Sequence, residues 1–115
     1  MRYIFLIYTR EGDGRGESVR ARQYAVMDAA SSRGVLVGAQ PLQETATATT
    51  VRMADGKPLI TDGPFAETKE QLAGYYIIDC KDLDEAIEWA KQIPTTCQGG
   101  AGCIEIRPLQ ELPPR

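Results

Sequence analysis

The order of its apolar segments is the feature that most constrains the fold of this chain. Two stretches, residues 3–9 and 71–80, are apolar over nearly their whole length, which is typical of strands in the interior of a sheet. In chain order, the core elements are predicted over residues 3–9 (strand), 18–33 (helix), 35–42 (strand), 71–80 (strand), 82–93 (helix) and 103–108 (strand). This order predicts a ferredoxin-like α+β domain of the βαβ-βαβ type.

An additional hairpin is predicted between the second and third of these strands. Residues 45–54 begin with strict alternation of threonine and alanine, and we expect the whole stretch to be one strand. Asp55-Gly56 follows it, and this dipeptide is a strong signal for a two-residue turn between antiparallel strands. Residues 57–61 complete an inserted β-hairpin, and Pro58 places that strand at a sheet edge because proline has no backbone N–H.

The two predicted helices differ in how clearly they show a buried stripe. The second has Asp82 as its N-cap and Glu85 as the reciprocal partner of a capping box. The first is rich in alanine and ends at Gly34, but its candidate stripe is weak. The stripes expected to face the core are Leu83, Ala86, Ile87 and Ala90 in the second helix, and Arg20, Tyr24, Met27 and Ser31 in the first.

A sheet with both helices on one face leaves its other face uncovered. That face is expected to carry Tyr, Ile and Leu side chains, and an apolar surface of this kind needs a partner. A two-fold homodimer with the two sheets facing each other is the simplest solution. The 115 residues fit a single domain, residues 1–115, which a partner subunit would help to stabilise.

Composition excludes several classes of site and partner. The chain has no histidine, so no imidazole can act as a general base, bind zinc or hold haem iron. Cys80, Cys97 and Cys103 form no CxxC pair, and we expect free thiols, no metal and no cofactor. A net charge of -3 without a basic run argues against nucleic acid. The first apolar run, residues 3–8, is too short for a signal sequence or a membrane span, which predicts a cytoplasmic protein without membrane contact.

Charged residues, a forced turn and aromatic side chains gather in residues 61–76, TDGPFAETKEQLAGYY. Composition alone favours a charged, solvated turn here. The stretch nevertheless resembles the signature of the DGPF-motif family within the YCII-related proteins. ATATTVR before the hairpin, DLDEAIEWA on the second helix and EIRP on the last strand match as well, so the resemblance covers roughly residues 39–108.

This resemblance implies a ferredoxin-like dimeric α/β barrel and says little about function. Some members sit beside sigma factors of the extracytoplasmic-function type. Other YCII-related proteins are small hydrolytic or eliminating enzymes that use a His and an Asp. That Asp would map to Asp62, but this chain has no His to complete the pair. Asp62 would have to be the base itself, which requires burial beside Phe65 and Tyr75 or Tyr76.

Strand alternation adds two arginines to the candidate site. Arg52 and Arg107 are expected to point towards the dimer cleft, where they could clamp a carboxylate or phosphate. A structural ion pair, Arg52 with Glu105 or Arg107 with Glu70, is the simpler and favoured interpretation. The candidate ligand-binding residues are Arg52, Asp62, Gly63, Pro64, Phe65, Glu67, Lys69, Tyr76 and Arg107, and Asp62 is also the candidate catalytic residue.

Three functions fit these residues. The first is a small-molecule binding or sensing domain with a cleft around the DGPF loop and a small organic acid as ligand. The second is a cofactor-independent lyase or hydrolase of a small organic acid with Asp62 as base. The third is a regulatory partner protein linked to sigma-factor-controlled transcription. The sequence leaves open whether the chain is an enzyme.

Overall fold

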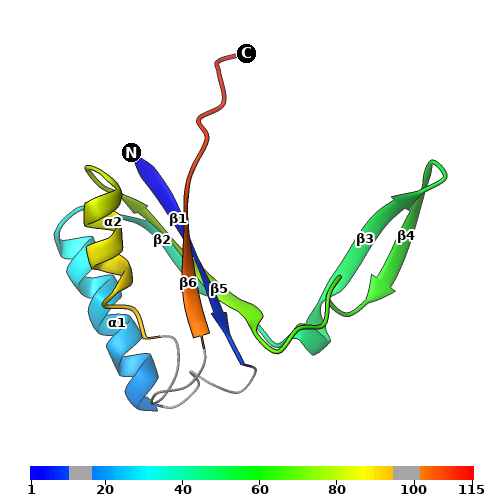
Figure 1. Ribbon diagram of the computed structural model, residues 1–115, viewed down its shortest axis with the longest axis horizontal. Helices are drawn as coiled ribbons and strands as arrows, with labels where there is room; N and C mark the ends of the chain where they lie inside the picture. Colours follow the sequence, from blue (N-terminus) through cyan, green and yellow to red (C-terminus); the bar gives the residue numbers. More distant parts are fainter. Residues whose placement is uncertain (11–16, 95–101) are drawn as a thin grey trace.

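The computed structural model of the chain describes residues 1–10, 17–94 and 102–115. Its core is an antiparallel sheet with the strand order β2-β5-β1-β6. The core elements are β1 Arg2–Thr9, α1 Glu17–Ser32, β2 Leu36–Pro41, β5 Gln71–Asp79, α2 Leu83–Ala90 and β6 Gly102–Pro108. Both helices lie on one side of this sheet (Figure 1). This strand order is that of the ferredoxin-like fold, so the predicted α+β class is confirmed.

The central strands β1 and β5 place the core on the helix side of the sheet. Burial alternates along both strands, as expected where one face packs on helices. Phe5 lies opposite Tyr76 and Tyr3 lies opposite Ile78, so these side chains share the helix side. The buried core consists of Tyr3, Phe5, Ile7, Val26, Ala30, Tyr76, Ile78, Cys80, Ala86, Trp89 and Ile93.

The buried face of α1 differs from the predicted one. Val19, Val26 and Ala30 are buried, whereas Arg20 is exposed and Tyr24 is 58% exposed. The stripe expected to face the core was therefore wrong at Arg20 and Tyr24, whereas its member Met27 does pack against the core. Small side chains let the helix approach the sheet closely, and the larger, more polar side chains of the predicted stripe lie to one side of that contact.

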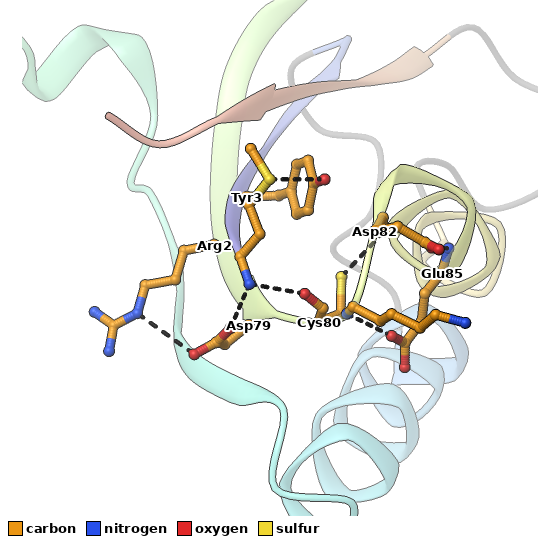
Figure 2. A network of polar contacts seen from close by, with 8 residues as sticks. Arg2, Tyr3, Asp79, Cys80, Asp82 and Glu85 are labelled. Carbon is orange, nitrogen blue, oxygen red and sulfur yellow. Dashed lines mark hydrogen bonds and ion pairs between the residues drawn. The ribbon is translucent and has the colours of Figure 1, made fainter. Parts of the chain in front are cut away.

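The start of α2 has the predicted cap with one difference. The Asp82 carboxylate accepts a hydrogen bond from the N–H of Glu85 at 3.0 Å. The Glu85 carboxylate accepts from the N–H of Lys81 at 2.7 Å, one residue before the cap (Figure 2). The Met1 nitrogen donates to the Cys80 carbonyl at 2.9 Å, which ties this turn to the start of β1. The capping contacts thus also fix the end of β5 against its neighbour.

The core face of α2 agrees with the predicted stripe only in part, at Ala86 and Ala90. Ala86 and Trp89 are buried, and Ile93 just beyond the helix is buried as well, whereas Leu83 is 50% exposed. Facing Trp89 towards the core removes the largest apolar side chain of this helix from water. The Arg33 guanidinium lies over the Trp89 ring, 5.7 Å from its centre. Neither described helix is long and apolar enough to cross a membrane.

The inserted hairpin forms a separate two-stranded sheet. It consists of β3 (Thr49–Ala54) and β4 (Lys57–Asp62). Asp55 and Gly56 form the predicted turn, and both have positive φ, 51° and 77°. In Figure 1 this hairpin stands away from the core sheet, on the side opposite the helices.

The strand predicted from residue 45 was wrong at its start. Thr45–Thr47 form a 3-10 helix instead. The N–H and the hydroxyl of Thr47 both donate to the Glu44 carbonyl, at 2.9 and 2.7 Å. Threonine can satisfy a nearby backbone carbonyl in this way, and such local bonds compete with strand pairing.

The face of the core sheet that points away from the helices is only partly covered. Ile4 and Leu6 of β1 lie opposite Ile77 and Tyr75 of β5, and all these side chains are half-buried. Tyr8 continues the row. The predicted Tyr, Ile and Leu side chains are therefore present on this surface, which we call the open face.

Gly74 marks a close approach between β5 and β2, and it generates a prediction. A Cβ on Gly74 would lie 2.8 Å from the Gln40 carbonyl oxygen and 3.1 Å from Pro41 Cα, both backbone atoms. We expect Gly74→Ala to lower the free energy of unfolding by about 1–3 kcal/mol, since the strands must separate. Urea denaturation measures this change.

Gly38→Ala is the matched control for this test. Gly38 lies on the neighbouring strand β2, and a Cβ there would meet nothing within 4 Å. Its free energy of unfolding should stay within about 0.5 kcal/mol of wild type. Equal losses in both variants would show that the close approach at Gly74 is not the cause.

Candidate functional site

The DGPF loop is fixed by hydrogen bonds that the backbone of Gly63 makes to residues of the hairpin and of the segment before it. Gly63 has φ of 100°, which favours glycine at this position. Its N–H donates to the Ala48 carbonyl at 2.7 Å, and its carbonyl accepts from the Thr50 hydroxyl at 2.7 Å. The glycine of the motif therefore has a structural reason to be there, because it closes the base of the hairpin.

A pocket of about 430 Å³ lies at this loop. The Gln71 amide donates to the carbonyls of Ala66 and Thr68 at 3.3 and 3.1 Å, which holds the far wall of the loop in place. The residues that line this pocket, which we call the loop pocket, are Thr45, Ala46, Gly63, Pro64, Glu67, Thr68, Lys69 and Gln71. It brings together four of the predicted site residues, Gly63, Pro64, Glu67 and Lys69.

The remaining predicted residues lie elsewhere. Arg52 and Asp62 belong to the two-stranded hairpin, whereas Arg107 lies on β6 opposite Ile4. Phe65 is 79% exposed and Asp62 is also exposed. Within one chain the two arginines thus belong to different sheets, and Asp62 is not enclosed by aromatic side chains.

The predicted structural ion pairs are likewise not formed. Within the described ranges, the ion pairs join Asp79 to the Met1 nitrogen and Arg2, and Glu88 to Lys91. Neither Arg52 with Glu105 nor Arg107 with Glu70 is among them. Glu105 instead accepts a long hydrogen bond from the Tyr8 hydroxyl at 3.5 Å.

Tyr76 lies at a different place from the loop. Its side chain is 4% exposed and points to the helix side of the sheet. The hydroxyl oxygen is buried, and no described residue forms a hydrogen bond with it. Burial raises the pKa of this hydroxyl above its ordinary value of 10.0. An isolated polar group of this kind is costly, which distinguishes Tyr76 from the rest of the core.

A second pocket, of about 440 Å³, adjoins the Tyr76 ring. It lies between α1 and the β2 side of the sheet, and we call it the helix pocket. Its lining residues are Ile7, Arg20, Gln23, Tyr24, Met27, Ala39, Gln40, Pro41 and Tyr76. The volume is within the range of about 300–1,000 Å³ that is usual for sites of small molecules.

The helix pocket explains the weak stripe of α1. Arg20, Gln23, Tyr24 and Met27 have the spacing of one helical face, and all four line the pocket. The spacing led to the expectation of a core-facing stripe, but its polar members line a pocket instead. Gln23 was not predicted as a site residue, and the polar face of α1 was the signal for it. Gln40 of β2 also lines the pocket, although it lies opposite Tyr75, and no sequence signal pointed to it.

The two pockets differ in what they can bind. The helix pocket combines apolar walls with the Tyr76 ring, the Gln23 amide and the Arg20 guanidinium group. This set can hold a small molecule with an apolar body and hydrogen-bonding ends. The loop pocket is lined by small and polar residues, with one carboxylate and one ammonium group.

Tyr76→Phe tests the state of the buried hydroxyl. Removing a buried polar group without a partner should raise the free energy of unfolding by about 1 kcal/mol at neutral pH. The raised pKa of Tyr76 adds a pH dependence. Above pH 10 the hydroxyl ionises more easily in the unfolded chain than in the folded one. The wild type therefore loses stability relative to the variant as the pH rises from 10 through the folded-state pKa, and the variant's advantage should widen.

Tyr75→Phe is the control for this measurement, because Tyr75 is the neighbouring tyrosine on the open face. Denaturant titrations at neutral and alkaline pH should show little change for it. A loss of stability in Tyr76→Phe at neutral pH would mean that the Tyr76 hydroxyl has a hydrogen-bond partner in solution.

No group of three or more His, Cys, Asp or Glu residues in the described ranges could hold a metal ion, and Cys97 lies outside those ranges.

Comparison with known proteins gives the family. A relative from Rhizobium meliloti (strain 1021), described as an uncharacterized protein, is 47% identical over 68 residues, which is 59% of this chain and 54% of the relative. The match thus spans about half the length of that relative. The family model of the YCII-related domain matches residues 1–113, and the chain therefore belongs to the YCII-related family.

Proposed function

We propose that this chain is a small-molecule-binding domain that acts as a homodimer, and that its ligand is a small organic acid held in the helix pocket. The observation that carries the proposal is the Tyr76 hydroxyl, which is buried beside a pocket and has no partner among the described residues. The hydroxyl oxygen has almost no accessible surface, so a ligand would supply the missing hydrogen bond after displacing part of the pocket wall. The cost of burying the hydroxyl then becomes a gain in ligand specificity.

The composition of the pocket walls supports an acid as the ligand class. Ile7, Met27 and Ala39 offer an apolar surface to a carbon skeleton. Arg20 supplies a permanent positive charge with a geometry suited to a carboxylate. The Tyr76 hydroxyl would then bond a second polar group of the same molecule.

The DGPF loop is the other candidate cleft. Its pocket contains Gly63, Pro64, Glu67 and Lys69, and Lys69 could pair with an acid. The backbone bonds of Gly63 already account for the motif as a turn. The helix pocket therefore has stronger support as the primary site.

Catalysis by Asp62 has less support than binding. A carboxylate base needs a desolvated position, and Asp62 is exposed at the end of β4 with Phe65 also exposed. Asp62 lines neither the helix pocket nor the loop pocket. The lyase or hydrolase reaction thus remains the second alternative, and a partner role in sigma-factor-controlled transcription remains the third.

The homodimer is supported by the open face. Half-buried Ile4, Leu6, Tyr75 and Ile77 form a continuous apolar row on a surface that the helices do not cover. A second copy with its own open face would cover this row by two-fold symmetry. The cytoplasmic location expected from the sequence stays a prediction.

A thermal-shift screen tests the proposed function. Wild-type protein is heated with a panel of small mono- and dicarboxylic acids and with their amides, which lack the charge. A ligand at 100 times its Kd adds about 2.7 kcal/mol of stability, which raises Tm by several degrees in a domain of this size. We expect acids, but not the matching amides, to raise Tm.

Three variants then locate the site. Tyr76→Phe and Arg20→Gln should weaken the shift at least about tenfold in acid concentration, since each removes one contact made by the ligand. Asp62→Asn, in the DGPF motif, should leave it unchanged. The reverse pattern would move the site to the DGPF loop. Mass spectrometry of the incubated acid detects turnover, which would support the enzyme alternative.

A further inference from the structure

The hairpin β3–β4 is exposed in a way that strands inside a domain are not. Apart from half-buried Thr50, each of its strand residues is exposed. The radius of gyration is 16.1 Å, whereas about 13 Å is expected for a compact domain of this length. Figure 1 shows the cause, since the hairpin projects from the body. We call residues 49–62 the arm.

One face of the arm is apolar. Val51 lies directly opposite Ile60, and Met53 lies opposite Pro58, so these four side chains share a face. Their large members are 61% (Val51), 68% (Met53) and 64% (Ile60) exposed. The other face carries Arg52 and Lys57. An isolated two-stranded hairpin is marginally stable in water, and this apolar face therefore needs a cover.

The position of the arm limits what can cover it. The helices lie on one side of the core sheet and the arm lies on the other, which is the side of the open face (Figure 1). Any molecule that docks on the open face therefore arrives beside the arm. The chain thus presents two uncovered apolar surfaces on the same side, and one partner can cover both.

We infer that the arm is a dimer clasp, in which the apolar face of one arm packs on the body of a second copy docked at the open face. The inference rests on the homodimer of the proposed function. The pairs Val51–Ile60 and Met53–Pro58 carry no charge, and Asp62, opposite Thr49, is the charged side chain at the base of this face, which disfavours a polyanionic partner such as nucleic acid. A second copy offers an apolar row, namely Leu6, Tyr75 and Ile77, with Glu105 and Arg107 beside it on β6.

Permanence also favours a second copy over a transient partner. An arm of this composition would expose strand edges and apolar side chains whenever its partner was absent, which is a hazard for aggregation. A second copy is present at the same concentration as the first. Two-fold symmetry then covers both arms and both open faces in a single closed contact.

Two neighbouring substitutions on opposite faces of the arm test this clasp. Ile60→Asp puts a charge on the apolar face, and Leu59→Asp puts the same charge on the other face, at a side chain that is 49% exposed. Sedimentation equilibrium measures the dimer Kd of each full-length protein. We expect Ile60→Asp to raise this Kd at least about tenfold and Leu59→Asp to change it less than about threefold.

The outcomes separate the clasp from the dimer and from ligand binding. A wild-type dimer whose Kd is unaffected by Ile60→Asp, or equally raised by both variants, overturns the clasp and leaves the homodimer standing. A monomeric wild type overturns both, while the thermal shift with acids still reports on the helix pocket. Circular dichroism checks that both variants fold.

A direct contact measurement covers the case in which Ile60→Asp does not fold. Isotope-labelled and unlabelled wild-type chains are mixed, and filtered nuclear Overhauser effects are recorded between chains. The clasp predicts contacts from the Met53 methyl group of one copy to ring protons of Tyr8 or Tyr75 of the other. A folded dimer in which Met53 shows no contact between chains overturns it.

Discussion

The pairing of β1 with β5 is the constraint on which the rest of this structure depends. Phe5 opposite Tyr76 fixes which side chains face the helices and which form the open face. Because side chains alternate along a strand, a slip by one residue would exchange the two faces. The same register buries the Tyr76 hydroxyl beside α1 and leaves Tyr75 on the opposite surface. The helix pocket and the open face are therefore two results of one pairing.

Much of the fold could be predicted from the sequence because its strongest signals are local. Apolar strands, the Asp55-Gly56 turn and the Asp82 cap each depend on a few neighbouring residues, and all of them are present. The segment Thr45–Thr47 was mispredicted as strand. Alternating small residues fit a strand, but they fit equally well a 3-10 helix in which a threonine hydroxyl donates a hydrogen bond to a nearby backbone carbonyl. The helix faces were predicted only in part. Ala86 and Met27 lie at the core as expected, but Trp89 and Ala30 are buried outside the predicted stripes, because burial depends on how each helix packs on the sheet.

The candidate site was harder to predict, because its parts are joined by packing rather than by sequence. The sequence analysis placed the residues of the DGPF stretch in one cleft because they are close along the chain. In the structure Tyr76 belongs to the helix side, Arg107 to β6 and Arg52 to the arm. Gln23 and Gln40 come from a helix and a strand whose contact no local pattern specifies. The polar character of the α1 stripe was the one indication of a pocket there.

Two features of the single chain lack a partner, the buried Tyr76 hydroxyl and the uncovered apolar surfaces, and they need partners of different size. The Tyr76 hydroxyl is buried without a hydrogen-bond partner among the described residues, and one polar atom of a small molecule is enough to provide one. An apolar arm and an open sheet face extend over many side chains, and only another folded surface can cover them. The core sheet separates the two, with Tyr76 on the helix side and the arm on the other. Binding of a small acid and association of two chains need not compete for the same surface. Any influence of one on the other would pass through the core sheet, where both β1 and β5 carry side chains of the helix pocket on one face and of the open face on the other.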